Sequence, residues 1–156
     1  MSDGDTPERA ALDAGAERIL APLSAHGFEY SRGDQGVSSG GPFAVGFFRR
    51  GALEIGLIIR SGHELGCPNY SAGRGYAGHA DLMYELGAAG REQLVEESWW
   101  AFKGRDGGDP FEALRHDLET IVLPALASSA TQFLAALARA VERHLASIGL
   151  PPPSSG

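Results

Sequence analysis

The strongest constraint on the fold is a pair of alternating apolar runs on either side of a short turn. The apolar positions are Phe43, Val45, Phe47, Leu53, Ile55, Leu57 and Ile59. A period of two is typical of β-strands that bury one face, and Arg50–Gly51 between the runs suits a tight turn. The sequence therefore predicts a β-hairpin, and we expect its seven apolar side chains to pack beneath helices.

Helices are predicted on both sides of this hairpin, and three of them follow residues that can cap a first turn. The capping residues are Thr6, Asp109 and Ser129, and the glycines suited to ending the first and last helices are Gly27 and Gly149. After each cap, apolar residues recur every three or four positions, as in an amphipathic helix. We expect Pro22 and Pro124 to bend or end their helices, because proline lacks the backbone N–H donor. A shorter helix is expected over residues 79–86.

The order of these elements predicts an α+β fold. We expect an antiparallel β-meander of three or four strands, packed against an N-terminal helix and two long C-terminal helices. A chain of 156 residues corresponds to about one domain. The prediction is therefore a single domain over residues 1–150, followed by a disordered Pro/Ser tail over residues 151–156.

Charge and composition narrow the classes of partner. The 20 acidic and 13 basic residues give a net charge of -7, which leaves no general positive field for nucleic-acid phosphates. No run approaches the roughly 18 consecutive apolar residues of a membrane span, and the acidic N-terminus differs from a secretory signal. A single cysteine fits a reducing compartment, and the Ala, Gly and Arg bias is typical of a GC-rich bacterial genome. We expect a cytoplasmic bacterial protein that binds neither nucleic acid nor membrane.

The segment Ser61–Gly78 is the first candidate for function. It has no periodicity and is longer than most connections in compact domains, and such loops are often functional. Its GRGYAG stretch matches the spacing of a nucleotide-binding glycine loop. A buried strand running directly into the first glycine is missing, however, so a chance match in a chain with 22 glycines is the alternative.

Several residues in or beside this segment have potential chemistry. His63, Cys67 and His79 could bind zinc or iron with Asp81 nearby, but no paired ligand motif accompanies them, and ordinary surface or core roles are the alternative. Cys67 could also be a nucleophile activated by a histidine, although Pro68 follows it and no helix N-terminus favours its thiolate. We predict no metal and no cofactor, and favour a protein that is not an enzyme.

Aromatic residues provide the other candidate for binding. Tyr70 and Tyr76 lie in the same segment, and Trp99 and Trp100 lie in a further predicted strand. Aromatic and arginine side chains often anchor protein interfaces, while core packing is the alternative for at least two of the rings. The resulting candidate binding residues are His63, Cys67, Tyr70, Arg74, Tyr76, His79, Trp99 and Trp100.

The order of a helix, a meander containing FAVGFFRRGALEIGLIIR and further helices resembles a group of small uncharacterised bacterial α+β proteins. The resemblance covers roughly residues 8–60. Some members of this group are similar to immunity proteins that bind and neutralise toxins, so the resemblance implies a protein partner, but it assigns no role to any residue. We expect a protein-binding module. The alternatives are a small enzyme or ligand-binding protein with a pocket under residues 61–78, and a homodimer whose interface is the exposed apolar surface.

Overall fold

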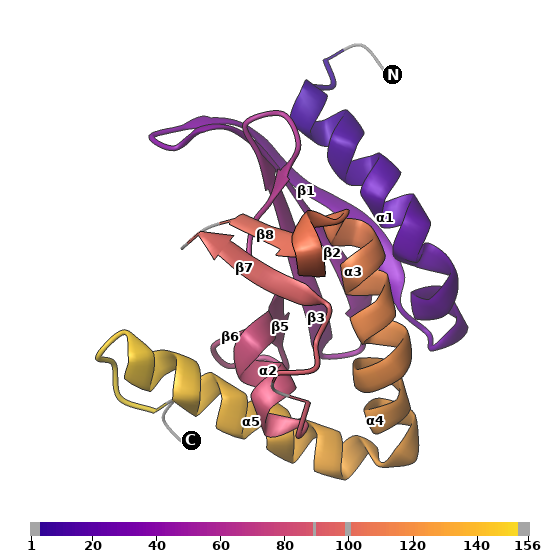
Figure 1. Ribbon diagram of the computed structural model, residues 1–156, viewed down its shortest axis with the longest axis vertical. Helices are drawn as coiled ribbons and strands as arrows, with labels where there is room; N and C mark the ends of the chain where they lie inside the picture. Colours follow the sequence, from indigo (N-terminus) through magenta and orange to yellow (C-terminus); the bar gives the residue numbers. More distant parts are fainter. Residues whose placement is uncertain (1–3, 89, 99–100, 153–156) are drawn as a thin grey trace.

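The helices and strands are arranged as in Figure 1, a computed structural model that describes residues 4–88, 90–98 and 101–152. In chain order they are α1 (Pro7–Ala25), β1 (Glu29–Ser38), β2 (Gly41–Arg50), β3 (Leu53–Arg60), β4 (Glu64–Leu65), β5 (Asn69–Ser71), β6 (Ala77–Gly78), α2 (His79–Glu85), β7 (Leu94–Ser98), β8 (Ala101–Gly104), a 3₁₀ turn (Arg105–Gly107), α3 (Pro110–Asp117), a π-helical turn (Leu118–Val122), α4 (Leu123–Ser128) and α5 (Ala130–Ser147). The side chains of Thr6, Asp109 and Ser129 each accept a hydrogen bond from the first turn of the helix that follows, as predicted.

The main sheet is antiparallel throughout. Its strand order is β1-β2-β3-β5-β6, with β4 paired to the end of β3, while β7 and β8 form a separate hairpin. The predicted α+β class is confirmed, with more strands than the three or four expected. The extra strands β4, β5 and β6 lie within Ser61–Gly78. Each has only two or three residues, too few to produce a periodic pattern in the sequence.

The predicted β2–β3 hairpin is confirmed, but β2 buries the opposite face from the one expected. Arg50 pairs with Leu53 across a two-residue turn, so every pair joins an even-numbered residue to an odd-numbered one. The buried residues on the inner face of these two strands are Ala44, Gly46, Phe48, Ile55, Leu57 and Ile59. On the outer face, Phe43, Val45 and Phe47 are only half-buried. The prediction that these three side chains pack beneath helices is therefore wrong.

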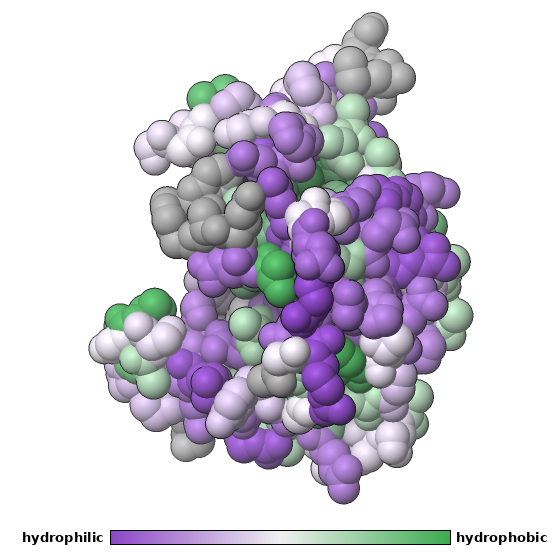
Figure 2. Space-filling model, in the orientation of Figure 1, coloured by the Kyte–Doolittle hydropathy of each residue, from purple (hydrophilic) through white to green (hydrophobic). Residues whose placement is uncertain are grey.

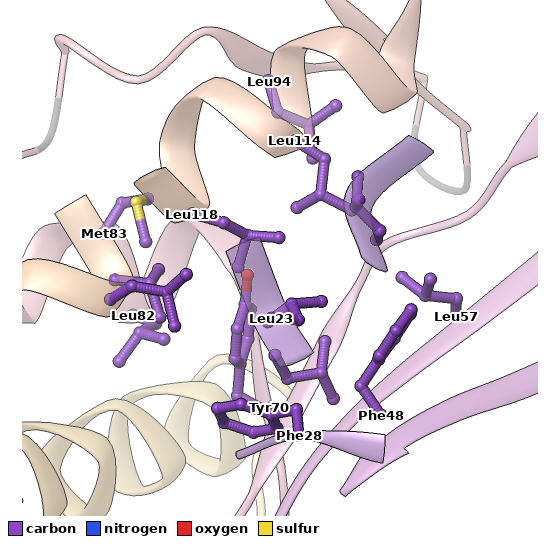
Figure 3. Close-up of a cluster of buried hydrophobic side chains, with 14 of the residues drawn as sticks. Leu23, Phe28, Phe48, Leu57, Tyr70, Leu82, Met83, Leu94, Leu114 and Leu118 are labelled. Carbon is purple, nitrogen blue, oxygen red and sulfur yellow. The ribbon is translucent and has the colours of Figure 1, made fainter. Parts of the chain in front are cut away.

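Helices α1 and α3 pack together beside the sheet, and α5 packs against α2 and β6 (Figure 1). Apolar side chains from the sheet and the helices meet in the core drawn in Figure 3, among them Leu23, Phe48 and Leu114. α1 and α3 approach each other closely at Gly15, where an added Cβ would lie 2.3 Å from the ring of Phe111. Glycine therefore allows this ring to pack directly on the backbone of α1.

A buried arginine joins α1 to the sheet. The pairing of β1 with β2 is irregular over residues 32–35, where the hydrogen-bond ladder opens. Arg9 is 1% exposed, and its Nη2 donates to the carbonyls of Gly33 at 2.8 Å, Asp34 at 3.2 Å and Val45 at 2.9 Å. One guanidinium group therefore supplies hydrogen bonds to both strands where the ladder is interrupted.

The C-terminal helical region is irregular near its proline and changes direction at Ser129, between α4 and α5. A π-helical turn precedes α4, and Pro124 occupies the first turn of α4. Proline cannot donate to the carbonyl four residues earlier, which is a common cause of such irregularities. The helical stretch Pro110–Ser128 meets α5 at an angle of 119°. No single described helix is long and apolar enough to cross a membrane, although this bent pair together has sufficient length and apolar composition.

Candidate functional site

Three polar side chains form a hydrogen-bonded chain inside the protein. The Tyr70 hydroxyl lies 2.8 Å from Nδ1 of His79, and Nε2 of His79 lies 2.8 Å from Oδ2 of Asp117. Tyr70 is 2% exposed, and His79 and Asp117 are 0% exposed. With Asp117 ionised, Nε2 donates to the carboxylate, and in the tautomer that carries its proton on Nε2, Nδ1 accepts from the tyrosine. We call these residues the buried triad.

Asp117 also holds the start of the β7–β8 hairpin. Its Oδ1 accepts from the N–H of Gln93 at 2.8 Å, and its Oδ2 accepts from the N–H of Leu94 at 3.1 Å. Burial alone favours the protonated acid, but the hydrogen bonds from His79 and these two N–H groups hold the pKa of Asp117 below its ordinary value. Burial raises the pKa of the Tyr70 phenol well above its usual value. The triad is closed to solvent, so it supports the fold rather than a reaction.

A cleft of about 560 Å³ opens beside the triad. Five parts of the chain line it: β3, the segment 66–78, α2, β7 and α5. They contribute, in chain order, Ile58, Cys67 and Tyr76, Asp81, Glu96, and His144. In Figure 1 the β7–β8 hairpin and the C-terminal end of α5 lie on the same side of the molecule, with β6 between them. Figure 2 shows the outline of the molecule indented there. We call this surface the cleft.

Cys67 lies at the cleft in surroundings that suppress its reactivity. Burial raises the pKa of its thiol to about 11, against the effect of a hydrogen bond from the backbone N–H of His79, and the carboxylates of Asp81 and Glu96 raise it further. At neutral pH the side chain is therefore a thiol, which is a poor nucleophile compared with a thiolate. The hypothesis that Cys67 is a nucleophile activated by a histidine is therefore disfavoured.

The glycine-rich stretch does not form a phosphate loop. Gly73 and Gly75 adopt positive φ in an exposed turn, and β6 separates this turn from α2. A Cβ added at Gly78, which caps α2, would lie 3.1 Å from Sγ of Cys67 and 3.5 Å from Oδ2 of Asp81. A carboxylate therefore stands where a phosphate would approach the start of the helix.

Aromatic and charged groups form the rim of the cleft. Tyr76 is 47% exposed, and its ring centroid lies 4.7 Å from that of His144. Oδ2 of Asp81 lies 3.5 Å from Nδ1 of His144, and Oδ1 lies 3.5 Å from Nε of Arg143. Glu96 is exposed and has no hydrogen bond or ion pair within the described part of the chain. The rim therefore combines an accessible aromatic ring with an accessible negative charge.

Four of the residues singled out in the sequence lie near one another, in two different settings. Cys67 and Tyr76 line the cleft, whereas Tyr70 and His79 are buried in the triad behind it. The backbone N–H of His79 donates to Cys67, so the two settings are in direct contact. The structure thus brings these four together without making a single accessible site.

The other four candidates lie elsewhere. His63 lines a separate groove of about 320 Å³ between β4, β8 and the start of α3. Arg74 is exposed in the turn after β5. Trp99 and Trp100 lie outside the described residues. Within residues 4–88, 90–98 and 101–152, no three His, Cys, Asp or Glu side chains come close enough to hold a metal ion.

Asp117 is the member of the buried triad that sequence reasoning did not consider. It lies one turn after Leu114 and next to Leu118, on the apolar stripe of the helix that begins at Pro110. A carboxylate on a buried stripe requires polar partners, so this position is the signal that could have identified it. Its partner His79 lies 38 residues away in the chain.

Comparison with known proteins assigns neither a family nor a function to the chain. No protein-family model matches the chain, and no curated protein or solved structure shows significant similarity to it. The function is therefore inferred from the geometry of the molecule.

Proposed function

We propose that the protein is a binding module that holds a segment of a partner protein in the cleft. The observation that carries this proposal is the cleft itself, a hollow of about 560 Å³ whose lining includes the exposed Tyr76 ring and the exposed carboxylate of Glu96. Tyrosine is among the residues that most often dominate binding energy at protein interfaces. An accessible carboxylate adds the ability to select a positively charged partner residue.

The lining of the cleft supports binding in another way. Ile58 and Phe102 contribute apolar surface, and Asp81, Glu96 and His144 contribute polar groups. An apolar centre with polar surroundings is typical of protein-binding surfaces. A toxin is one candidate partner, because the order of elements resembles that of immunity-like proteins.

Two features favour binding over catalysis. The Cys67 thiol is held protonated by its surroundings, and the hydrogen-bonded triad of Tyr70, His79 and Asp117 is closed to a substrate. A reaction at this surface would need an activated group that is also accessible, and these residues do not supply one.

The proposal can be tested by affinity capture from the organism of origin with matched variants. Tyr76→Ala removes the ring at the rim, and Glu96→Lys reverses the charge. Tyr84→Ala is the control, because Tyr84 is 51% exposed and lies under Arg143 but does not line the cleft. We expect a protein that is captured by the native chain and the control, and lost with both cleft variants.

The captured protein is then purified and its affinity measured by calorimetry. Tyr76→Ala should weaken binding by about tenfold or more, as truncation of an anchoring aromatic usually does. Equal affinity for the native chain and both cleft variants would rule out the cleft as the docking site.

A small-molecule ligand is the second candidate. The volume of the cleft, about 560 Å³, is within the range of roughly 300–1,000 Å³ that is common for ligand sites. Native mass spectrometry of freshly purified protein distinguishes the two candidates. A retained mass that disappears in His144→Ala would favour the ligand, and a bare chain mass would favour the protein partner.

A further inference from the structure

We propose that the partner segment is bound as an extended peptide that carries a basic side chain, and that the side-chain amide of Asn69 hydrogen-bonds to its main chain. This inference rests on the proposed function, because it names the kind of segment that the cleft holds. The features that support it are a second hollow beside the cleft, the position of Asn69 and the carboxylates of the cleft lining.

A second hollow of about 290 Å³ adjoins the cleft. It is lined by residues of β2, β3 and β5, among them Phe47 and Glu54. Asn69 and Tyr76 belong to the lining of both hollows, so the two meet at these residues. A segment that lies in the cleft can therefore continue past the exposed Tyr76 ring into the second hollow.

Asn69 stands in a trough of bare backbone where the hollows meet. Its neighbours across the sheet are Gly56 on β3 and Gly78 on β6, and paired residues of antiparallel strands point to the same face. A Cβ added at Gly56 would lie 3.9 Å from the Cβ of Asn69. Neither paired neighbour has a side chain, so the amide of Asn69 can be approached over both adjacent strands.

The amide of Asn69 has bonding capacity that the chain does not use. Across the part of the chain that the structure describes, no group forms a hydrogen bond with it, although the residue is partly buried. A carboxamide has N–H donors and an acceptor oxygen, and one residue of an extended chain presents its own N–H and C=O on the same side. In a helix both groups are already bonded within the helix. An extended segment is therefore the partner that Asn69 fits.

The carboxylates of the cleft favour a basic side chain on this segment. Asp81 and Glu96 both lie close enough to Cys67 for their charges to raise the pKa of its thiol. Asp81 is paired with Arg143 and His144, whereas Glu96 is exposed. An arginine or lysine of the segment therefore gains most beside Glu96, because opposite charges across an interface select the partner.

The second hollow offers less to a charged group. Arg49 lies over the Phe47 ring, 4.4 Å from its centroid, and its Nε donates to Glu54 at 2.7 Å. The carboxylate of Glu54 is therefore already paired. Arg60, which also lines the cleft, is the register partner of Glu64 at the end of β3. We expect the basic side chain in the cleft and an uncharged part of the segment in the second hollow.

Panning of a display library of random linear heptapeptides against the folded full chain tests the proposal. Enriched peptides should contain arginine or lysine. As synthetic peptides they should bind at least about tenfold more weakly to Glu96→Gln and to Asn69→Leu, since each variant removes a partner of a polar group in the bound peptide. Tyr84→Ala is the control, because Tyr84 is exposed and lines neither hollow. Circular dichroism should confirm that all variants are folded.

Replacement of single peptide bonds by esters tests the main-chain contact directly. An ester lacks the N–H donor and leaves the protein unaltered. At one position the ester should weaken binding to the native chain by about tenfold, and the same ester should have little further effect on binding to Asn69→Leu. The coupling measured by this cycle assigns the lost hydrogen bond to Asn69.

Two results would overturn the proposal. One is a selection that yields no peptide weakened by both Glu96→Gln and Asn69→Leu. The other is an ester scan in which no position couples to Asn69. A protein captured through Tyr76 and Glu96 that binds Asn69→Leu as tightly as the native chain would contradict this inference and leave the proposed function intact. Failure to capture any protein would count against the proposed function alone if the peptides behave as expected.

Discussion

Nε2 of His79 and Oδ2 of Asp117 lie 2.8 Å apart, and neither side chain is more than 1% exposed. The pair connects the first turn of α2 to the end of α3 and, through Asp117, to the start of β7. Removing one member of a buried hydrogen-bonded pair leaves the other without a partner and without water, which is more costly than losing a surface contact.

We predict that His79→Ala lowers the free energy of unfolding by about 3 kcal/mol, because it leaves the buried Asp117 carboxylate and Tyr70 hydroxyl without their hydrogen-bond partner. Urea unfolding followed by circular dichroism measures this loss. His116→Ala is the control: this exposed histidine lies next to Asp117 in the chain, and its replacement should change stability by less than about 0.5 kcal/mol. Similar losses in the two variants would contradict a stabilising role for the triad.

The free energy of unfolding should fall at acid pH, because Asp117 is then protonated. Burial opposes ionisation of this carboxyl, but its hydrogen bonds outweigh burial and lower its pKa from the ordinary value of 3.8. The ionised form therefore stabilises the fold above about pH 4, and that contribution is lost as pH falls toward the lower folded-state pKa. Asp117→Asn should be less stable than the native chain at pH 7 and should lose less stability between neutral and acid pH.

Unfolding midpoints at a series of pH values test this prediction. Glu142→Gln is the control, because Glu142 is exposed on α5, and its pH dependence should follow that of the native chain. A native-like acid response in Asp117→Asn would show that other carboxyls are responsible.

Cys67 should react slowly with alkylating reagents. Its pKa of about 11 compares with 9.0 for a free thiol, so at pH 8 its thiolate fraction is about a hundredfold smaller. Iodoacetamide labelling followed by mass spectrometry should show this difference between the folded chain and the chain in denaturant. Equal rates in the two states would mean that the thiol is accessible and unperturbed.

Gly15→Ala should destabilise the protein, even though alanine favours helices by about 1 kcal/mol over glycine. The added methyl group would lie 2.3 Å from the Phe111 ring, and overpacking of this kind typically costs about 1–3 kcal/mol. Phe111→Leu removes the obstructing ring. In that background Gly15→Ala should become neutral or stabilising, and a double-mutant cycle of unfolding free energies measures the coupling.

The fold class could be predicted from the sequence because helix caps and strand alternation depend on neighbours in the chain. The buried face of β2 could not, because β2 is apolar on both faces, with Phe43, Val45 and Phe47 on one side and Ala44 and Phe48 on the other. Alternation alone does not say which set is buried. The two-residue turn decides it by pairing Phe48 with Ile55.

The candidate site was harder to predict, because its residues come from separate elements. The segment around Cys67 and Tyr76 could be selected as an irregular, glycine-rich stretch. The other walls of the cleft, at Glu96 and His144, come from β7 and α5, and no local spacing connects them to that segment. Only the packing of the helices and the hairpin around the sheet brings these side chains together.

The buried guanidinium of Arg9 affects the edge of the main sheet through which copies of this chain could associate. β1 forms one edge of the main sheet and is ten residues long, and a straight open edge of that length is a template for uncontrolled strand addition. Arg9 donates to the carbonyls of Gly33 and Asp34, at the irregularity that interrupts this edge strand. Interruptions of this kind hinder the addition of a further strand, so the bond from helix α1 stabilises a feature that works against edge-to-edge association.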